Sequence, residues 1–191
     1  MNVEFEAMFL GVDIPQFRIK LSEAGAQCTM KERLMKRSNY FLPNMPDSQD
    51  TWLRVRDEGD RVTMTIKQNS EQATIDSQKE LEMIVSDYDT AVAVILKMGA
   101  VQKSYQETRR ETWEFRGVEI ALDTWPGLRS YVEIEGCNED IVQEVSTLLG
   151  FSYTDALFDD VGKVYELELG IPQKEMYDVP VITFENPPQK R

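Results

Sequence analysis

The sequence of 191 residues contains no histidine. This absence removes the most common general base, the Ser-His and Cys-His nucleophile systems and most zinc sites. Any catalysis must therefore use carboxylates, lysine, arginine, tyrosine or oxygen-bound metal ions. Because carboxylate oxygens are hard ligands, a glutamate-rich site favours Mg²⁺ or Mn²⁺.

Cysteines, long apolar runs and basic charge are also scarce. The two cysteines, Cys28 and Cys137, form no metal-type cluster, and we interpret them as packing residues of a protein in the reducing cytoplasm. No apolar run could span a bilayer, and the N-terminus lacks the basic start and apolar core of a secretory signal. The net charge of −13 argues against partners that need a positive surface. We expect a cytoplasmic monomer or homodimer that binds neither nucleic acid nor membranes.

Alternation of apolar and polar residues predicts a protein built mainly of strands. Strands are expected at residues 3–9, 27–41, 52–56, 61–67, 79–85, 101–115, 118–124 and 130–135. Helices with capping residues or a final glycine are expected at 15–25, 87–98 and 138–149. Residues 43–46 are interpreted as a loop, and the proline-containing remainder after Gly150 as an irregular tail packed on the outside. The expected domain covers residues 1–170, followed by a C-terminal tail at 171–191.

Charged or polar residues at even spacing share one face in six of these strands. The residues in question are Glu4 and Glu6, Arg54 and Arg56, Thr63, Thr65 and Lys67, Glu80 and Glu82, Glu119 and Asp123, and Glu133 and Glu135. A single pair of this kind is typical of an exposed sheet face. If the sheet closes on itself, however, the charged faces converge on an interior that is costly unless its charges pair, bind ions or stay hydrated. A hydrated tunnel that binds a polyanion and cations meets this condition.

The order of these motifs resembles the CYTH family, the triphosphate tunnel metalloenzymes, which include class IV adenylate cyclases, thiamine triphosphatases and inorganic triphosphatases. The resemblance covers residues 3–155. Its motifs are Glu4-x-Glu6, Leu53-Arg54-Val55-Arg56, Thr65-Ile66-Lys67, Glu80-Leu81-Glu82, Arg109-Arg110-Glu111, Leu122-Asp123 and Val132-Glu133-Ile134-Glu135. It implies an α+β fold, in which a closed eight-stranded antiparallel β-barrel forms the triphosphate tunnel and helices pack outside.

The resemblance also implies roles for the motif residues. The residues that would contact triphosphate oxygens are Arg54, Arg56, Lys67 and Arg110, with Arg109 in place of Arg110 if the register is shifted by one. The residues that would hold Mg²⁺ or Mn²⁺ are Glu4, Glu6, Glu133 and Glu135, with Asp123 or Glu82 nearby. The candidate catalytic residues are Lys67, Arg110 and Glu82.

One position departs from the family pattern. The first motif of the family is Glu-x-Glu-x-Lys, and Met8 stands at the position of the lysine. Since a methionine neither carries charge nor donates a hydrogen bond, either another cation substitutes, with Lys103 and Arg129 as candidates, or activity is weak or absent. Alternatively, Met8 simply packs within a variant barrel.

The resemblance implies a metal-dependent enzyme that acts on a nucleoside or inorganic triphosphate, and two reactions remain open. In hydrolysis, water attacks the terminal phosphorus. In cyclisation of ATP, the ribose 3′-hydroxyl attacks the α-phosphorus and pyrophosphate leaves. The segment Ser152-Tyr153-Thr154-Asp155 faintly resembles the cyclase-like branch, although a tyrosine there is more often a packing residue. The alternatives are a non-catalytic binder of triphosphate or polyphosphate, which Met8 favours, and a structural barrel with an ion-paired interior.

Overall fold

The computed structural model describes residues 1–43, 51–69, 74–76 and 78–190. The strands of its main sheet are β1 (Asn2–Phe9), β2 (Gln27–Phe41), β3 (Thr51–Asp57), β4 (Val62–Asn69), β5 (Gln78–Val85), β6 (Val101–Phe115), β7 (Val118–Thr124) and β8 (Tyr131–Gly136). The helices between and before these strands are α1 (Ile14–Ala24), α2 (Tyr88–Lys97) and α3 (Glu139–Leu148). The predicted bounds of all these elements agree with the observed ones to within two residues. The loop predicted at 43–46 lies outside the described residues beyond Pro43.

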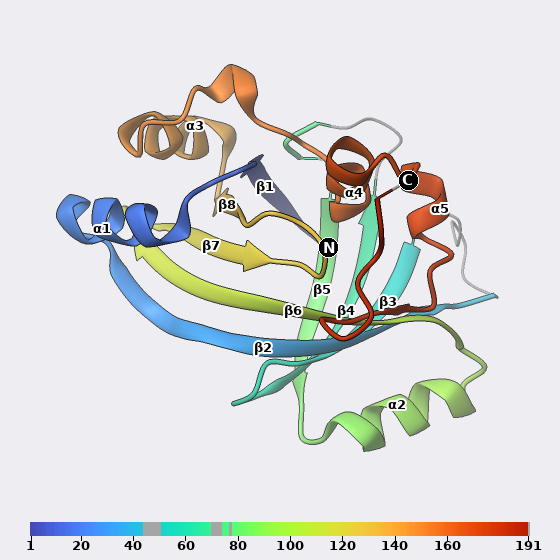
Figure 1. The fold of residues 1–191 in the computed structure, drawn as a ribbon. Coiled ribbons are helices and arrows are strands. Elements are labelled where there is room, and N and C mark those ends of the chain that lie inside the picture. Colours follow the sequence, from blue (N-terminus) through green and yellow to red (C-terminus); the bar gives the residue numbers. More distant parts are fainter. Residues whose placement is uncertain (44–50, 70–73, 77, 191) are drawn as a thin grey trace.

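The eight strands form a closed ring (Figure 1). Their order is β2-β3-β4-β5-β1-β8-β7-β6, and β6 pairs with β2 to complete the circle. Every neighbouring pair within the ring is antiparallel. The ring is not evenly round one axis, because β7 pairs with β6 only along residues 109–115, whereas β2 follows β6 from one end to the other. The predicted α+β fold with a closed eight-stranded antiparallel barrel is confirmed.

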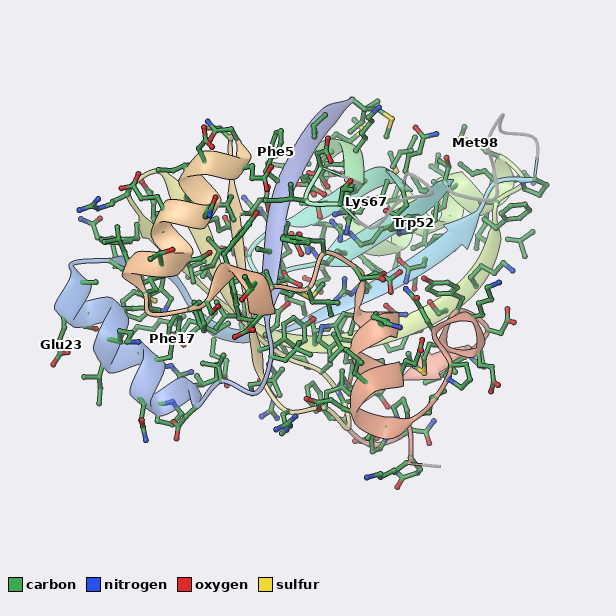
Figure 2. The ribbon with its side chains drawn as sticks, turned by 90° about the horizontal axis from the view of Figure 1, so that it is seen from above. Phe5, Phe17, Glu23, Trp52, Lys67 and Met98 are labelled. Carbon is green, nitrogen blue, oxygen red and sulfur yellow. The ribbon has the colours of Figure 1, made fainter. Side chains whose placement is uncertain are left out.

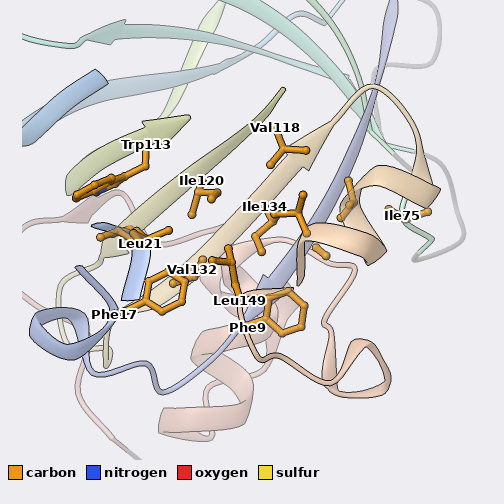
Figure 3. Packing of buried hydrophobic residues seen from close by; sticks show 14 residues of the cluster. Phe9, Phe17, Leu21, Ile75, Trp113, Val118, Ile120, Val132, Ile134 and Leu149 are labelled. Atoms are coloured by element: carbon orange, nitrogen blue, oxygen red, sulfur yellow. The ribbon is translucent and has the colours of Figure 1, made fainter. Parts of the chain in front are cut away.

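Apolar residues on the outer faces of β1, β7 and β8 form the largest core, which α1 and α3 cover (Figure 3). Ile120, Val132 and Ile134 from the strands meet Leu21 of α1 and Leu149 at the end of α3. Because successive strand residues point to opposite sides, this apolar outer face leaves the alternate positions for the inside of the ring. A smaller core lies between α2 and the outer face of β3.

The C-terminal segment differs from the predicted irregular tail. It contains the 3₁₀ turn η1 (Tyr153–Asp155), the helices α4 (Val161–Leu169) and α5 (Gln173–Met176), and the short strand β9 (Val181–Ile182). Helix α4 begins where the Asp160 carboxylate accepts the N–H of Gly162, and it ends at Gly170, whose φ of +70° is left-handed. These capping residues are visible in the sequence, but the nearby prolines favoured a loop interpretation.

The C-terminal segment covers one end of the ring instead of packing on its outside. Leu157 pairs with Met8 of β1, and Val181 and Ile182 of β9 pair in parallel with the early part of β6. Between these two attachments, α4 and α5 contribute to an apolar cluster with residues of the ring (Figure 1). We call this the end cluster; its buried members are Met8, Trp125, Leu128, Tyr131, Val164, Tyr165, Ile171, Met176 and Ile182. None of the helices in the described part of the chain has the length and apolar character needed to cross a bilayer.

Candidate active site

The inner face of the ring is divided by charge. Cations project from β2, β3, β4 and β6, and they are Arg37, Arg54, Arg56, Lys67 and Arg110. Carboxylates project from β1, β5, β7 and β8, and they are Glu4, Glu6, Glu80, Glu82, Asp123, Glu133 and Glu135. Strand pairing places these two groups around the same interior, as the charged strand faces predicted.

Lys67 connects the cationic strand β4 to the acidic strands β1 and β5. Its Nζ lies 2.9 Å from Oε2 of Glu4 and 3.4 Å from Oε2 of Glu80. Figure 2 shows Lys67 among polar side chains beside β1. Burial alone would raise the pKa of Glu4, but the attraction and hydrogen bond of Lys67 outweigh it and lower this pKa. The predicted phosphate ligand Lys67 and the predicted metal ligand Glu4 therefore form a direct ion pair.

Arg54 and Arg56 lie side by side on the inner face of β3. Arg54 is 7% exposed, and its nearest carboxylate oxygen, on Glu82, is 3.7 Å away. Arg56 instead donates through Nε to Glu58 at 2.8 Å. Burial first, and then repulsion from Arg56 and Arg37, holds the pKa of Arg54 well below its ordinary value. An anion between these arginines would relieve that repulsion.

Glu58 was predicted only as part of a hairpin turn, yet it is 2% exposed. Its carboxylate also accepts from Nε of Arg61 at 2.7 Å and from the hydroxyl of Thr63 at 3.3 Å. The turn thus folds an acidic side chain back onto the inner face, where it fixes Arg56. Sequence pattern alone gives no signal for this, because turns commonly expose their acidic residues.

Arg110 is the inner residue of the Arg109-Arg110 pair. Its Nε donates to Asp123 Oδ1 at 2.7 Å, and its Nη2 also contacts Glu133. Burial would lower the pKa of Arg110, but Asp123 and Glu133 outweigh burial and raise it well above its ordinary value. Arg109 is exposed on the outer face, with its guanidinium 4.8 Å from the ring centre of Phe184. The structure therefore brings Arg110 and not Arg109 to the other predicted residues.

Carboxylates crowd together on β1 and β8. Burial, followed by repulsion from Glu133 and Glu135, raises the pKa of Glu6 well above its usual range. Burial also raises the pKa of Glu133, and burial with repulsion from Glu4 and Glu119 raises that of Glu135 to about 7. These oxygen donors suit a hard divalent cation, which would relieve their mutual repulsion. Among the described residues, however, no three acidic or cysteine side chains lie close enough together to coordinate one metal ion without moving.

A small cavity of about 10 Å³ lies against Glu4 and Glu6. The C-terminal segment closes its far side with Leu157, Phe158 and Asp159. This is room for about one water molecule.

Met8 points to the same side as Glu4 and Glu6 but lies in the end cluster, with 3% of its surface exposed. Neither proposed substitute cation reaches it. Lys103 is exposed, with Nζ 5.7 Å from the ring centre of Phe41, and Arg129 forms a 3.1 Å ion pair with Glu168 of α4. The position of the family lysine is thus occupied by apolar packing, with Lys103 and Arg129 placed away from it.

Tyr153, in the segment that faintly resembles the cyclase-like branch, packs outside the ring. Its ring centre is 5.5 Å from that of Phe158, and it borders the large outer core. Its hydroxyl donates to Glu139 of α3 at 3.2 Å. This placement matches the interpretation of Tyr153 as a packing residue.

Besides Glu58, two further inner residues were missed by the sequence interpretation. Arg37 of β2 lies directly opposite Arg56 of β3, and its guanidinium lies 4.3 Å from the ring centre of Trp125. Strand β2 carries charge on both faces between residues 31 and 37, so alternation does not reveal which side is inner. Trp125 follows β7 and gives no sequence signal other than its size.

Comparisons with known proteins agree with this architecture. The closely similar folds include a conserved hypothetical protein from Pyrococcus furiosus, with a TM-score of 0.67, 18% identity, and coverage of 82% of this chain and 96% of the other. A proposed adenylate cyclase from Vibrio parahaemolyticus has a TM-score of 0.72 at 12% identity, covering 86% and 98%. A proposed adenylyl cyclase from Hippeastrum, described as revealing a dominant triphosphatase activity, has a TM-score of 0.56 at 14% identity, covering 91% and 99%.

At these identities the solved structures establish a shared fold. None of the curated protein sequences compared with this chain matches it. The sequence pattern of the CYTH domain, in contrast, matches residues 17–148, which is more than half of the chain and includes seven of the eight ring strands. The protein belongs to the CYTH domain family.

Proposed function

We propose that this protein is a metal-dependent enzyme that acts on a nucleoside or inorganic triphosphate inside the ring. The observation that carries the proposal is the separation of charge across the interior, with buried arginines on one side and crowded carboxylates on the other. A polyanion is attracted to the first side and cations to the second. A complex of triphosphate with divalent cations supplies both.

The cationic side would bind the phosphate oxygens. Arg54 and Arg56 present planar guanidinium groups from one strand, which suits contacts to phosphate oxygens. Lys67 and Arg110 flank them, each already bonded to carboxylates of the acidic side. Since both sit between the two charged groups, they are placed to hold phosphate and to stabilise charge that develops on it.

The acidic side would hold Mg²⁺ or Mn²⁺ through Glu4, Glu6, Glu133 and Glu135, with Asp123 close to Glu133. When bound, such an ion neutralises phosphate charge and orients the attacking oxygen. Glu82 lies next to Arg54 and accepts a 2.8 Å hydrogen bond from Thr65. We assign to Glu82 the acceptance of a proton from the attacking hydroxyl or water.

Hydrolysis of the terminal phosphate is the reaction we favour, with cyclisation of ATP as the alternative within the same site. The activity described for the Hippeastrum neighbour supports testing hydrolysis first. The contacts described above address phosphates and metal ions, which the two reactions share. The choice between them therefore depends on which oxygen is brought to which phosphorus.

Met8 favours a second candidate function, the binding of triphosphate or polyphosphate without turnover. The family lysine is replaced by a side chain buried in the end cluster, and the two proposed substitutes, Lys103 and Arg129, lie elsewhere. The remaining inner cations still provide an anion site. This candidate differs from the enzyme in turnover and not in binding.

A product assay with binding measurements tests the proposal. Inorganic triphosphate, ATP and thiamine triphosphate are incubated with Mg²⁺ or Mn²⁺, and phosphate, pyrophosphate and cyclic AMP are measured. Arg56→Gln should weaken triphosphate binding about 10- to 100-fold, since a charge-assisted hydrogen bond contributes roughly 1.5–3 kcal/mol. Glu135→Gln should mainly raise the metal concentration required. Arg116→Gln is the control, because Arg116 is 53% exposed and pairs with Glu144 outside the ring.

The outcomes separate the candidates. Turnover that depends on metal and is reduced in the inner variants supports the enzyme. Tight binding of all three triphosphates without any product supports the binding protein. Failure of the wild-type protein to bind any triphosphate with either metal would contradict both.

A further inference from the structure

Arg37 differs from the other inner cations in its partners. Arg54, Arg56, Lys67 and Arg110 each lie within 4.0 Å of a carboxylate oxygen. Arg37 has no such ion pair with any residue that the structure describes. Its guanidinium instead lies over the face of Trp125, 4.3 Å from the ring centre. Asp123 and Glu133 attract the charge of Arg37, but neither forms a direct ion pair with it.

Three buried N–H donors near this point lack an acceptor within the described part of the chain. They are Nε of Arg37, Nε of Arg54 and Nε1 of Trp125. Trp125 is 4% exposed and Arg54 is 7% exposed. Buried donors are normally paired, so unpaired ones indicate a missing partner. Because all three are donors, acceptors such as water molecules or the oxygens of an oxyanion would satisfy them.

The surrounding charge points to the same kind of ligand. Arg37 lies directly across from Arg56 in the β2–β3 pair, and like charges in that arrangement repel. Burial, then Arg56 and Arg110, lower the pKa of Arg37 to about 10, so the guanidinium is still charged at neutral pH. An anion between the two strands would be attracted by both arginines.

Trp125 fixes how Arg37 can meet such an anion. Its indole belongs to the end cluster and packs edge-on against Tyr165 of α4, with ring centres 6.5 Å apart. The contact with this indole restricts how the planar guanidinium of Arg37 can turn. Trp125 is therefore a positioning residue for Arg37, and its own N–H is a further donor.

We propose that Arg37, positioned by Trp125, is a further phosphate-binding residue and forms the subsite for one end phosphate of the triphosphate. This inference rests on the proposed function and adds a contact that the family motifs do not include. The subsite lies at the end of the ring that the C-terminal segment covers. The Arg54 and Arg56 pair then holds the adjoining part of the phosphate chain.

The first test measures binding of inorganic triphosphate in Mg²⁺ by isothermal titration calorimetry. Arg37→Gln should weaken binding about 10- to 100-fold, the range for loss of one charge-assisted hydrogen bond. Arg37→Lys keeps the charge but loses the planar fork, so it should fall between wild type and Arg37→Gln. Arg116→Gln, on the outside of the ring, should bind like wild type.

The second test distinguishes a binding role from a structural one. Without ligand, Arg37→Gln should unfold at the same urea concentration as wild type or at a higher one, because removing a buried charge that has no direct ion pair offsets the loss of its contact with Trp125. Triphosphate should then raise the midpoint of the wild type more than that of Arg37→Gln. A structural residue would give the opposite result, with a lower midpoint in the absence of ligand and unchanged binding.

The third test uses the indole as a reporter. Inorganic triphosphate does not absorb in the ultraviolet range used for tryptophan, so its binding can be followed by intrinsic fluorescence. Wild type should change emission on binding, and Trp125→Phe should lose this change although Trp52 and Trp113 remain. Trp125→Phe should also bind a few-fold more weakly, because it lacks the indole N–H.

Two results would overturn the inference and are distinguishable. If Arg37→Gln binds triphosphate like wild type while Arg56→Gln binds it more weakly, Arg37 is no ligand and the proposed function stands. If wild type itself binds no triphosphate, the proposed function fails and the subsite fails with it.

Discussion

Substituting Met8 by lysine restores the family residue at a position that the end cluster now occupies. Met8 is 3% exposed and packs among Trp125, Tyr131 and Tyr165. Burial of a methionine side chain contributes about 1.5–3 kcal/mol, and an ammonium group in its place costs several kcal/mol more unless it is paired. Glu133 lies opposite on β8, but it already contacts Arg110. We therefore expect Met8→Lys to lower the free energy of unfolding by roughly 3–5 kcal/mol.

Urea unfolding followed by circular dichroism measures this loss. Met8→Leu is the matched control, since a volume-conserving apolar exchange usually costs less than about 1.5 kcal/mol. Limited proteolysis should show faster cleavage of the C-terminal segment in Met8→Lys, because its contacts at Met8 are weakened. We expect no gain of triphosphate turnover.

The opposite outcome would refute the reasoning. If Met8→Lys is as stable as wild type and as resistant to proteolysis, position 8 faces a hydrated interior and the end cluster does not seal it. An increase in turnover in that variant would further identify the missing lysine as the limit on activity.

Two more predictions follow from buried charges. Because the pKa of Glu135 is raised from 4.5 to about 7, the stability it contributes is complete below pH 4.5 and is lost as the pH rises through 7. In metal-free buffer, the unfolding free energy of wild type should therefore fall between pH 5 and 8, and Glu135→Gln should reduce this fall. The reduction should be at most roughly 3 kcal/mol, since one pKa unit corresponds to about 1.4 kcal/mol. An unchanged pH profile in Glu135→Gln would contradict this. Arg110→Gln should lower the thermal midpoint of unfolding, because it leaves the buried Asp123, 1% exposed, without its cation. The expected cost is about 3–5 kcal/mol. Arg109→Gln, on the outer face, is the control and should change neither stability nor triphosphate binding. Equal thermal midpoints for the two variants would place Arg110 outside the ring.

The strands and the first three helices were predictable because their periodicity and caps are local properties. Ring closure came from the resemblance, since alternation alone does not tell whether a sheet closes. The choice between Arg109 and Arg110 needed the register in which Arg110 faces Asp123. A one-residue shift would have turned the other side chain inward.

The residues that escaped prediction depend on contacts between distant segments. Arg37 lies on a strand with charge on both faces, so its side is fixed by pairing with β3 and β6. Glu58 is buried because the hairpin turn folds back, which the turn sequence does not encode. Helix α4 has both caps in the sequence, but its apolar side acquires a partner only when the ring presents Met8 and Tyr131.

The attachment of the C-terminal segment to both β1 and β6 has a consequence for long substrates. The segment crosses one opening of the ring, from Leu157 at Met8 to Val181 and Ile182 beside Tyr105 and Gln106. A linear polyphosphate would therefore enter by the opposite opening and could not be threaded through. It would have to be engaged by its terminus, so any shortening would proceed stepwise from a chain end, and a polymer blocked at both ends would resist it.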